Sequence, residues 1–157
     1  MRTYSLRPAS FGDLELTYEI TRDAMRDYVI QTWGAWNEDE QREKHLQNYT
    51  PSTYRIVVRD GADIGLVAVE NEPDHLWLVK LYLITSSRRL GIGTSLLHQV
   101  INEADQLHKP VRLRVLRVNQ DAQRLYLRHG FAVVGEETDR LFMLRRASGA
   151  SQETPSK

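Results

Sequence analysis

The chain has 157 residues, of which 41% are hydrophobic and 27% charged, values typical of one globular domain with its own core. Its 21 basic and 21 acidic residues leave no net charge, which excludes electrostatic capture of nucleic acid or an anionic membrane. No cysteine is present, so disulfides, thiolate metal sites and a cysteine acyl-enzyme are excluded. No secretory segment opens the chain and no apolar run approaches a membrane span, so we expect a cytoplasmic protein.

The first part of the chain predicts a strand, two helices and a hairpin. The strand ends at Pro8, and Asn37 or Asp39 caps the second helix. A turn at Asp60-Gly61-Ala62-Asp63 joins the two hairpin strands. The predicted ranges are 3–7 (strand), 13–30 and 37–49 (helices), and 54–59 and 64–70 (strands).

Residues 75–84 are apolar on both faces except for Lys80, as expected of a central strand covered on both sides. A loop with Gly91 and Gly93 follows, and then a helix from about Thr94 to His108. Glycines let a ligand approach the backbone, and free N–H groups at a helix start attract phosphate oxygens. The loop therefore predicts an anion site, although it lacks the third glycine of the dinucleotide fingerprint and the lysine of a P-loop.

The last part predicts a strand over 111–118, a helix over 119–130 and a closing hairpin of strands 131–134 and 140–145. Asn119 caps this helix and Gly130 ends it. Ala122 and Tyr126 share one helix face, which suits a narrow groove with a hydroxyl at its end. Alternatively, Phe131 packs on Tyr126 as the ordinary contact of a helix C-terminus.

The order of predicted elements is β-α-α-β-β-β-α-β-α-β-β, which predicts a mixed three-layer α/β domain over residues 1–146. Residues 147–157 are small, polar or charged and cannot build a core, so we expect a disordered tail there.

Two motifs together resemble the GNAT superfamily of N-acetyltransferases. Residues 88–93 (Arg-Arg-Leu-Gly-Ile-Gly) match the family's (Gln/Arg)xxGx(Gly/Ala) pyrophosphate loop, and residues 119–131 match its Asn-helix-Tyr-Gly-Phe motif. The resemblance implies an α/β/α fold whose mixed central sheet is splayed between the strands at 81–84 and 111–118. It also implies direct acetyl transfer from acetyl-CoA to a primary amine and a possible homodimer.

The resemblance implies a role for each residue that matches the motifs. Backbone N–H groups of the loop bind the pyrophosphate, with Arg88 or Arg89 adding charge, and the N–H of Leu83 polarises the thioester carbonyl. Tyr126 protonates the leaving thiolate as general acid. The implied cofactor-binding residues are Leu81, Leu83, Arg88, Arg89, Leu90, Gly91, Ile92, Gly93, Thr94, Asn119, Ala122 and Tyr126.

The general base stays open. An amine acceptor is mostly ammonium at neutral pH and must lose a proton before it attacks. Some family members place a glutamate in the central strand, where this chain has Trp77. Glu70 is the first candidate and His75 the second, with a water chain to solvent as the alternative.

The acceptor site is open to two interpretations. Trp33 and Trp36, beside Glu38, form either an apolar wall rimmed by carboxylates that holds a cationic amine, or core anchors beside a helix cap. The family often builds its acceptor pocket from the loop between these two helices. A pocket closed by the tryptophans favours a small molecule, and an open groove favours a protein N-terminus or lysine.

Two functions of other classes remain as alternatives: an acyl-CoA sensor without catalysis, and a structural domain in which the glycines and Tyr126 serve only packing. No metal is expected, because the remaining histidines lack the spacing of metal ligands; these are His45, His98, His108 and His129.

Overall fold

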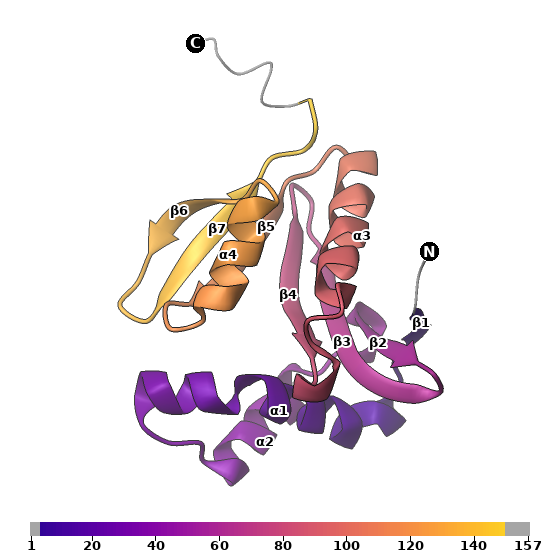
Figure 1. Cartoon of the computed structure of the whole chain (residues 1–157), viewed down its shortest axis with the longest axis vertical. Helices are drawn as coiled ribbons and strands as arrows, with labels where there is room; N and C mark the ends of the chain where they lie inside the picture. The colour runs from indigo at the N-terminus through magenta and orange to yellow at the C-terminus, as the bar shows by residue number, and fades with distance from the viewer. Residues whose placement is uncertain (1–3, 150–157) are drawn as a thin grey trace. The chain divides into compact units, whose positions relative to one another are not determined.

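The computed structural model describes residues 4–149. Its elements follow the predicted order and alternate strands with helices, which confirms the mixed α/β class (Figure 1). The strands are β1 (Ser5–Pro8), β2 (Tyr54–Arg59), β3 (Ala62–Asn71), β4 (Leu76–Leu83), β5 (Val111–Leu116), β6 (Ala132–Glu136) and β7 (Arg140–Arg145). The helices are α1 (Leu14–Trp33), α2 (Glu38–Asn48), α3 (Ile92–Gln106) and α4 (Gln120–Arg128), with short 3-10 turns at Phe11–Asp13, Pro51–Thr53 and Thr85–Ser87.

The strands are ordered β1-β2-β3-β4-β5-β7-β6 in one mixed sheet. β1, β2 and β3 pair antiparallel, β4 pairs parallel with β5, and β7 pairs antiparallel with both β5 and β6. The chain divides into two compact units. Unit 1 contains the residues up to Ala68 and Lys80–Gly93, and unit 2 contains Val69–Val79 and the residues from Thr94 onward.

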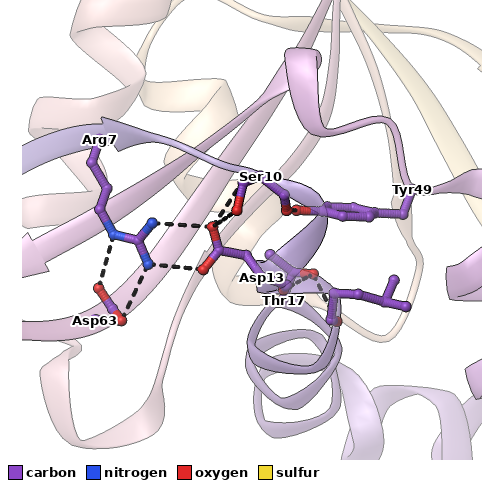
Figure 2. Close-up of polar contacts among 7 residues, drawn as sticks. Arg7, Ser10, Asp13, Thr17, Tyr49 and Asp63 are labelled. Carbon is purple, nitrogen blue, oxygen red and sulfur yellow. Dashed lines mark hydrogen bonds and ion pairs between the residues drawn. The ribbon is translucent and has the colours of Figure 1, made fainter.

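An arginine of β1 ties together three segments of unit 1 (Figure 2). Arg7 donates to both carboxylate oxygens of Asp13, at 3.1 and 3.0 Å, and to those of Asp63 at 3.4 and 3.3 Å. Hydrogen bonds from Arg7 lower the pKa of the Asp13 carboxyl. The Tyr49 hydroxyl donates to the carbonyl of Ser10 at 2.6 Å. The start of α1 is therefore fixed to β1, to β3 and to the end of α2.

The helix boundaries of unit 1 settle one point that the sequence left open and correct one prediction. Asn37 caps α2, because its side-chain oxygen accepts from the Glu40 N–H at 2.9 Å. α1 continues to Trp33 instead of ending at Ile30, and the left-handed Gly34, with φ +94°, ends it. Trp33 thus belongs to a helix and not to the connecting loop.

The interior of unit 2 is built from α3, β5 and β7. One face of α3 buries Leu97, Val100 and Ala104, and alternate residues of β5 are buried, including Val111 and Leu113. This alternation follows from the two-residue period of a strand with one face on a core.

Three boundaries of unit 2 differ from the prediction. β5 ends at Leu116 instead of Val118, because a turn follows in which the Asn119 N–H donates to the Leu116 carbonyl at 3.0 Å. β6 starts at Ala132 and extends to Glu136, with an irregularity in its pairing between Val133 and Gly135.

The predicted tail starts too early. Ala147 is buried, and Ser148 donates to Asp105 of α3 through its N–H at 2.9 Å and its hydroxyl at 2.8 Å. These contacts place residues 147 and 148 in the packed part of unit 2. Residues 150–157 lie outside the described residues, and their disorder stays a prediction.

Candidate functional site

The predicted anion-binding loop lies in unit 1, directly after β4. The Arg88 side chain connects the loop to β4 and α1. Its Nε donates to the Leu83 carbonyl at 3.2 Å, and its Nη2 donates to the Ala24 carbonyl at 3.4 Å. Asp23 of α1 accepts from the N–H and the hydroxyl of Thr85, at 2.8 and 3.0 Å. Helix α1 therefore anchors both ends of the Thr85–Arg88 segment.

The loop backbone has the conformation that its glycines predict. Gly91 has φ +80°, and Arg89, two residues earlier, has φ +67°. A Cβ on Gly91 would meet no atom within 4 Å, so the backbone conformation, rather than lack of space, favours glycine there. The surface above Gly91 is open to a ligand.

Helix α3 begins at Ile92, two residues before the predicted start near Thr94. Gly93 and Thr94 consequently lie in its first turn, where backbone N–H groups have no partner within the helix. The helix has 15 residues, so its dipole adds positive potential at this end. Loop and helix start together present N–H groups suited to an anion.

Helix α4 of unit 2 has the predicted ends. The Asn119 side-chain oxygen accepts from the Ala122 N–H at 3.2 Å, and Gly130 is left-handed with φ +92°. The Tyr126 ring is buried and lies 5.5 Å from the Phe131 ring, centroid to centroid. The predicted packing of Phe131 on Tyr126 is therefore present. It involves the ring and does not decide what the hydroxyl binds.

The two tryptophans of the predicted acceptor wall differ in their surroundings. Trp33 is 53% exposed at the end of α1. Trp36 donates through Nε1 to Glu38 at 3.1 Å and to the Tyr18 hydroxyl at 3.3 Å. Arg22 and Arg42 pair with Glu38 at 2.7 and 3.3 Å. The Glu38 carboxylate is thus already neutralised, and hydrogen bonding from Tyr18 lowers its pKa.

The two candidate bases lie in unit 2. Glu70 is half-buried near the end of β3. His75 is 2.7 Å from the exposed carboxylate of Asp74 through Nδ1, and its ring lies edge-on to Trp77 at 6.2 Å. Leu83, the residue expected to polarise the thioester, belongs to unit 1.

Unit 1 also contains two titratable side chains that the sequence did not assign to the site. His45 is buried and its Nε2 lies 2.8 Å from the Thr17 hydroxyl; burial lowers its pKa to about 4. Lys80 of β4 donates to the Thr21 hydroxyl at 3.5 Å, and burial lowers its pKa to about 8. The only sequence signal for Lys80 is its interruption of an apolar run.

An open groove of about 670 Å³ follows α1 in unit 1. Its apolar part includes Ile20 and Ile84, and its acidic part includes Asp23, Asp27 and Asp63. Ile84 directly follows Leu83, so the groove reaches the end of β4. Two arginines of α1, Arg22 and Arg26, also line the groove, so its charges are mixed with an excess of carboxylates.

The amino-acid sequence of residues 16–131 matches the acetyltransferase (GNAT) family. The chain belongs to the GNAT acetyltransferase family. Both recognised motifs, residues 88–93 and 119–131, fall within or at the end of the matched region.

Solved structures share this GNAT fold at low sequence identity. The PaiA N-acetyltransferase from Thermoplasma acidophilum, in complex with coenzyme A, has a TM-score of 0.74 at 19% identity, covering 92% of this chain and 99% of its own. The ribosomal-protein-S18-alanine N-acetyltransferase from Escherichia coli gives 0.71 at 19%, with 96% and 97% covered. Arabidopsis thaliana Naa50, in complex with the bisubstrate analogue CoA-Ac-MVNAL, gives 0.62 at 15%, with 92% and 99% covered. No protein of curated function matches the sequence.

Residues 4–149 contain neither a candidate metal site nor a membrane-spanning helix. No group of three or more histidine, cysteine, aspartate or glutamate side chains there is arranged to hold a metal ion. Within the same residues, no helix is long and apolar enough to cross a membrane.

Proposed function

We propose that this GNAT protein transfers an acetyl group from acetyl-CoA to a primary amine by direct attack. The main support is the loop after β4, where a left-handed Gly91 and the first turn of α3 present backbone N–H groups to an anion. Family membership and the coenzyme A bound by the PaiA N-acetyltransferase add to it.

In this proposal the pyrophosphate of acetyl-CoA accepts from backbone N–H groups between Arg88 and Thr94, including those of Leu90 and Ile92. Arg89 supplies the positive charge, because the Arg88 guanidinium already donates to two backbone carbonyls of unit 1. The role that the sequence left to either arginine is thereby assigned to Arg89.

The pantetheine arm pairs with the backbone of Leu81 and Leu83 as an added strand would. The N–H of Leu83 donates to the thioester carbonyl and stabilises the oxyanion that forms on attack. Asn119 uses its side-chain oxygen to cap α4, which leaves its amide NH₂ for the arm, and Ala122 is small enough to leave room beside it.

Tyr126 donates a proton to the departing thiolate in this proposal. A phenol has a reference pKa of about 10 against about 8.5 for a thiol, so it assists as a hydrogen-bond donor more readily than as a full acid. We expect Tyr126→Phe to lower kcat by roughly 10- to 100-fold while acetyl-CoA still binds. Undiminished kcat at saturating substrate would remove this role.

The acceptor is a cationic amine, and a small molecule is favoured over a peptide. The acidic groove along α1 ends at Ile84, beside the residue proposed to polarise the thioester, and gives an ammonium group a favourable path. Trp33 is 53% exposed, and in this proposal its ring contacts the acceptor. Glu38 contributes less than the sequence suggested, because Arg22 and Arg42 already neutralise it.

Two glycines of unit 1 allow a matched test of the cofactor site. Gly61 in the β2–β3 turn and Gly91 have φ +78° and +80°, and a Cβ on either would meet no atom within 4 Å. Valine therefore introduces the same backbone strain at both positions. By titration calorimetry, we expect Gly91→Val to weaken acetyl-CoA binding at least tenfold and Gly61→Val to leave it unchanged.

Equal weakening in the two variants would mean that strain, and not the loop, explains the loss. Binding that neither substitution changes would remove the loop from the cofactor site. Absence of binding to the wild-type protein would contradict the proposed function itself.

A further inference from the structure

We propose that Lys80 accepts the proton that the acceptor amine must lose before it attacks the thioester. This inference rests on the proposed function and assigns the general base that the motifs leave open. Lys80 becomes part of the catalytic machinery of unit 1, together with the backbone of Leu83.

The position of Lys80 is the first argument. It lies in β4 three residues before Leu83, which places the two Cα atoms about 10 Å apart along an extended strand. The Lys80 side chain extends to Thr21 of α1, and the neighbours of Thr21 in that helix, Ile20 and Arg22, line the groove. Both residues belong to unit 1, as does the groove that ends at Ile84, whereas Glu70 and His75 belong to unit 2.

The surroundings of the Lys80 ammonium are the second argument. Its Nζ lies 3.5 Å from the Thr21 hydroxyl of α1, 5.6 Å from the ring centre of Tyr54 in β2 and 5.9 Å from that of Tyr82. None of these contacts, within the described residues, is a carboxylate. An ammonium withdrawn from water without a negative partner favours its neutral form.

His45 of α2 does not stabilise the Lys80 ammonium. The two side chains interact electrostatically, and the positive charge of Lys80 contributes to the lowered pKa of His45. The pKa of His45 is itself lowered to about 4 by burial, so His45 is neutral when the protein works near pH 7. It neither pairs with the Lys80 ammonium nor repels it under these conditions.

The consequence is an amine that is partly neutral at ordinary pH. Burial lowers the pKa of Lys80 to about 8, so about half of it is neutral at pH 8. An unperturbed lysine, with a pKa near 10.4, is less than about 1% neutral at that pH. A base is most effective when its pKa lies near the working pH.

The reaction balances with Lys80 in this role. The acceptor ammonium gives one proton to the neutral Nζ of Lys80, and the free amine then forms a bond to the thioester carbonyl carbon. The carbon–sulfur bond breaks, and the second proton lost from the attacking nitrogen reaches the thiolate through Tyr126. Lys80 releases its proton to solvent. The products are the acetylated amine, coenzyme A and one proton.

A purely structural Lys80 is the competing explanation, since its Nζ lies near two tyrosine rings. Methionine preserves most of the side-chain length and removes the base, and arginine keeps the charge but does not deprotonate. Lys44 on the exposed face of α2 provides the control, Lys44→Met.

The test measures kcat/KM against pH for the wild type and the three variants, with folding checked by circular dichroism. In the wild type, kcat/KM should rise with pH through about 8, as Lys80 deprotonates. Lys80→Met and Lys80→Arg should both lose this step and at least about 100-fold of kcat/KM at pH 7.5. Lys44→Met should behave as the wild type.

A Lys80→Met enzyme with wild-type kcat/KM and an unchanged pH profile would overturn the inference while leaving the proposed function intact. Recovery of activity in Lys80→Arg alone would also overturn it, because charge would then be sufficient. Titration of each variant with acetyl-CoA shows whether a loss of activity comes from the missing base or from weaker cofactor binding. If the wild-type protein binds no acetyl-CoA, or releases no coenzyme A with any amine, both the Lys80 inference and the proposed function are contradicted.

Discussion

The interiors of the two units differ in chemistry. Thr17, His45 and Ser87, which are the buried polar residues among those described, all lie in unit 1, as does Lys80. The interior of unit 2 around α3, β5 and β7 consists of apolar side chains such as Leu97, Leu113 and Met143. The buried imidazole and the Lys80 amine therefore lie in unit 1, whereas unit 2 buries the phenol of Tyr126 among apolar side chains.

This difference has a cost. A buried amine or imidazole favours its neutral form and weakens the folded state wherever the unfolded chain would be protonated. Apolar side chains of the same volume would be more stable in those places. Groups that reduce stability are expected where chemistry uses them. We therefore expect substitutions of buried apolar residues in unit 2 to lower the free energy of unfolding equally at every pH. Substitutions of the buried titratable residues in unit 1 should change how the free energy of unfolding depends on pH.

The largest effect is expected in unit 2. Leu97 is fully buried on α3, and Leu97→Ala should lower the free energy of unfolding by about 2–5 kcal/mol through lost burial and the cavity that remains. Urea denaturation at pH 6, 7 and 8 should give the same loss. A loss that varies strongly with pH would show that the unit 2 interior is coupled to a titrating group.

Lys80→Met is expected to stabilise the protein. The folded-state pKa of Lys80, about 8, lies below that of an unfolded lysine, so between these values the unfolded chain binds more protons and stability rises with pH. The penalty is complete below pH 8. Its removal should raise the free energy of unfolding by about 2 kcal/mol at pH 7.

The gain from Lys80→Met should shrink as pH approaches 10.5 and vanish above it, where the lysine is neutral in both the folded and the unfolded chain. Urea denaturation at pH 7 and pH 10 measures the two gains directly. A variant that is less stable than the wild type at pH 7 would mean that the ammonium is well solvated or paired, and the contrast between the units would weaken.

His45 should make the protein sensitive to acid. Its folded-state pKa is about 4 against 6.5 for the ordinary side chain, so the unfolded state binds more protons between these values and stability falls as pH falls. We expect a loss of about 2 kcal/mol between pH 7 and 4.5 from this group. His45→Gln keeps a side chain that can pair with Thr17 and cannot titrate, so it should flatten that slope.

Thermal unfolding of wild type and His45→Gln at pH 7 and 4.5 checks this expectation. If the melting temperature falls equally in the two proteins between pH 7 and 4.5, groups other than His45 cause the acid sensitivity. Asp13 is one of them, since Arg7 lowers its pKa.

The smallest effect concerns the Arg7 contacts of Figure 2. Arg7→Lys keeps the charge and loses the paired donors that reach Asp13 and Asp63. Because these side chains are partly exposed, we expect a loss of only about 0.5–1 kcal/mol in the free energy of unfolding. Arg42 likewise pairs with two carboxylates, Glu15 and Glu38, but these side chains are more exposed. Arg42→Lys is therefore the matched control and should cost less.

Local signals in the sequence predicted the local structure well. Asn119 and Gly130 act as predicted, and Asn37 is the cap of the two candidates that the sequence offered, because a cap or a left-handed residue depends on its nearest neighbours. The end of α1 was placed three residues early, since no breaker precedes Gly34.

The polar interior of unit 1 depends on contacts between distant residues. Thr17 and His45 are separated by 28 positions, and Thr21 and Lys80 by 59. The sequence showed Lys80 as an exception in an apolar strand, but it contained no signal for the tyrosines and the helix that enclose it. Pairing of Glu38 with Arg22, 16 positions away, was missed for the same reason. Pairing of Glu38 with Arg42 was a local signal that was overlooked, because the two residues are four apart in α2.

The most direct test of the account is release of free thiol from acetyl-CoA by the wild-type protein across a panel of small amines and peptides, with the products identified by mass spectrometry. The account predicts thiol release that depends on an amine and matches the acetylated product one to one, fastest with a small cationic amine. Acetyl-CoA that binds but releases no thiol with any amine would contradict it and would favour a sensor without catalysis.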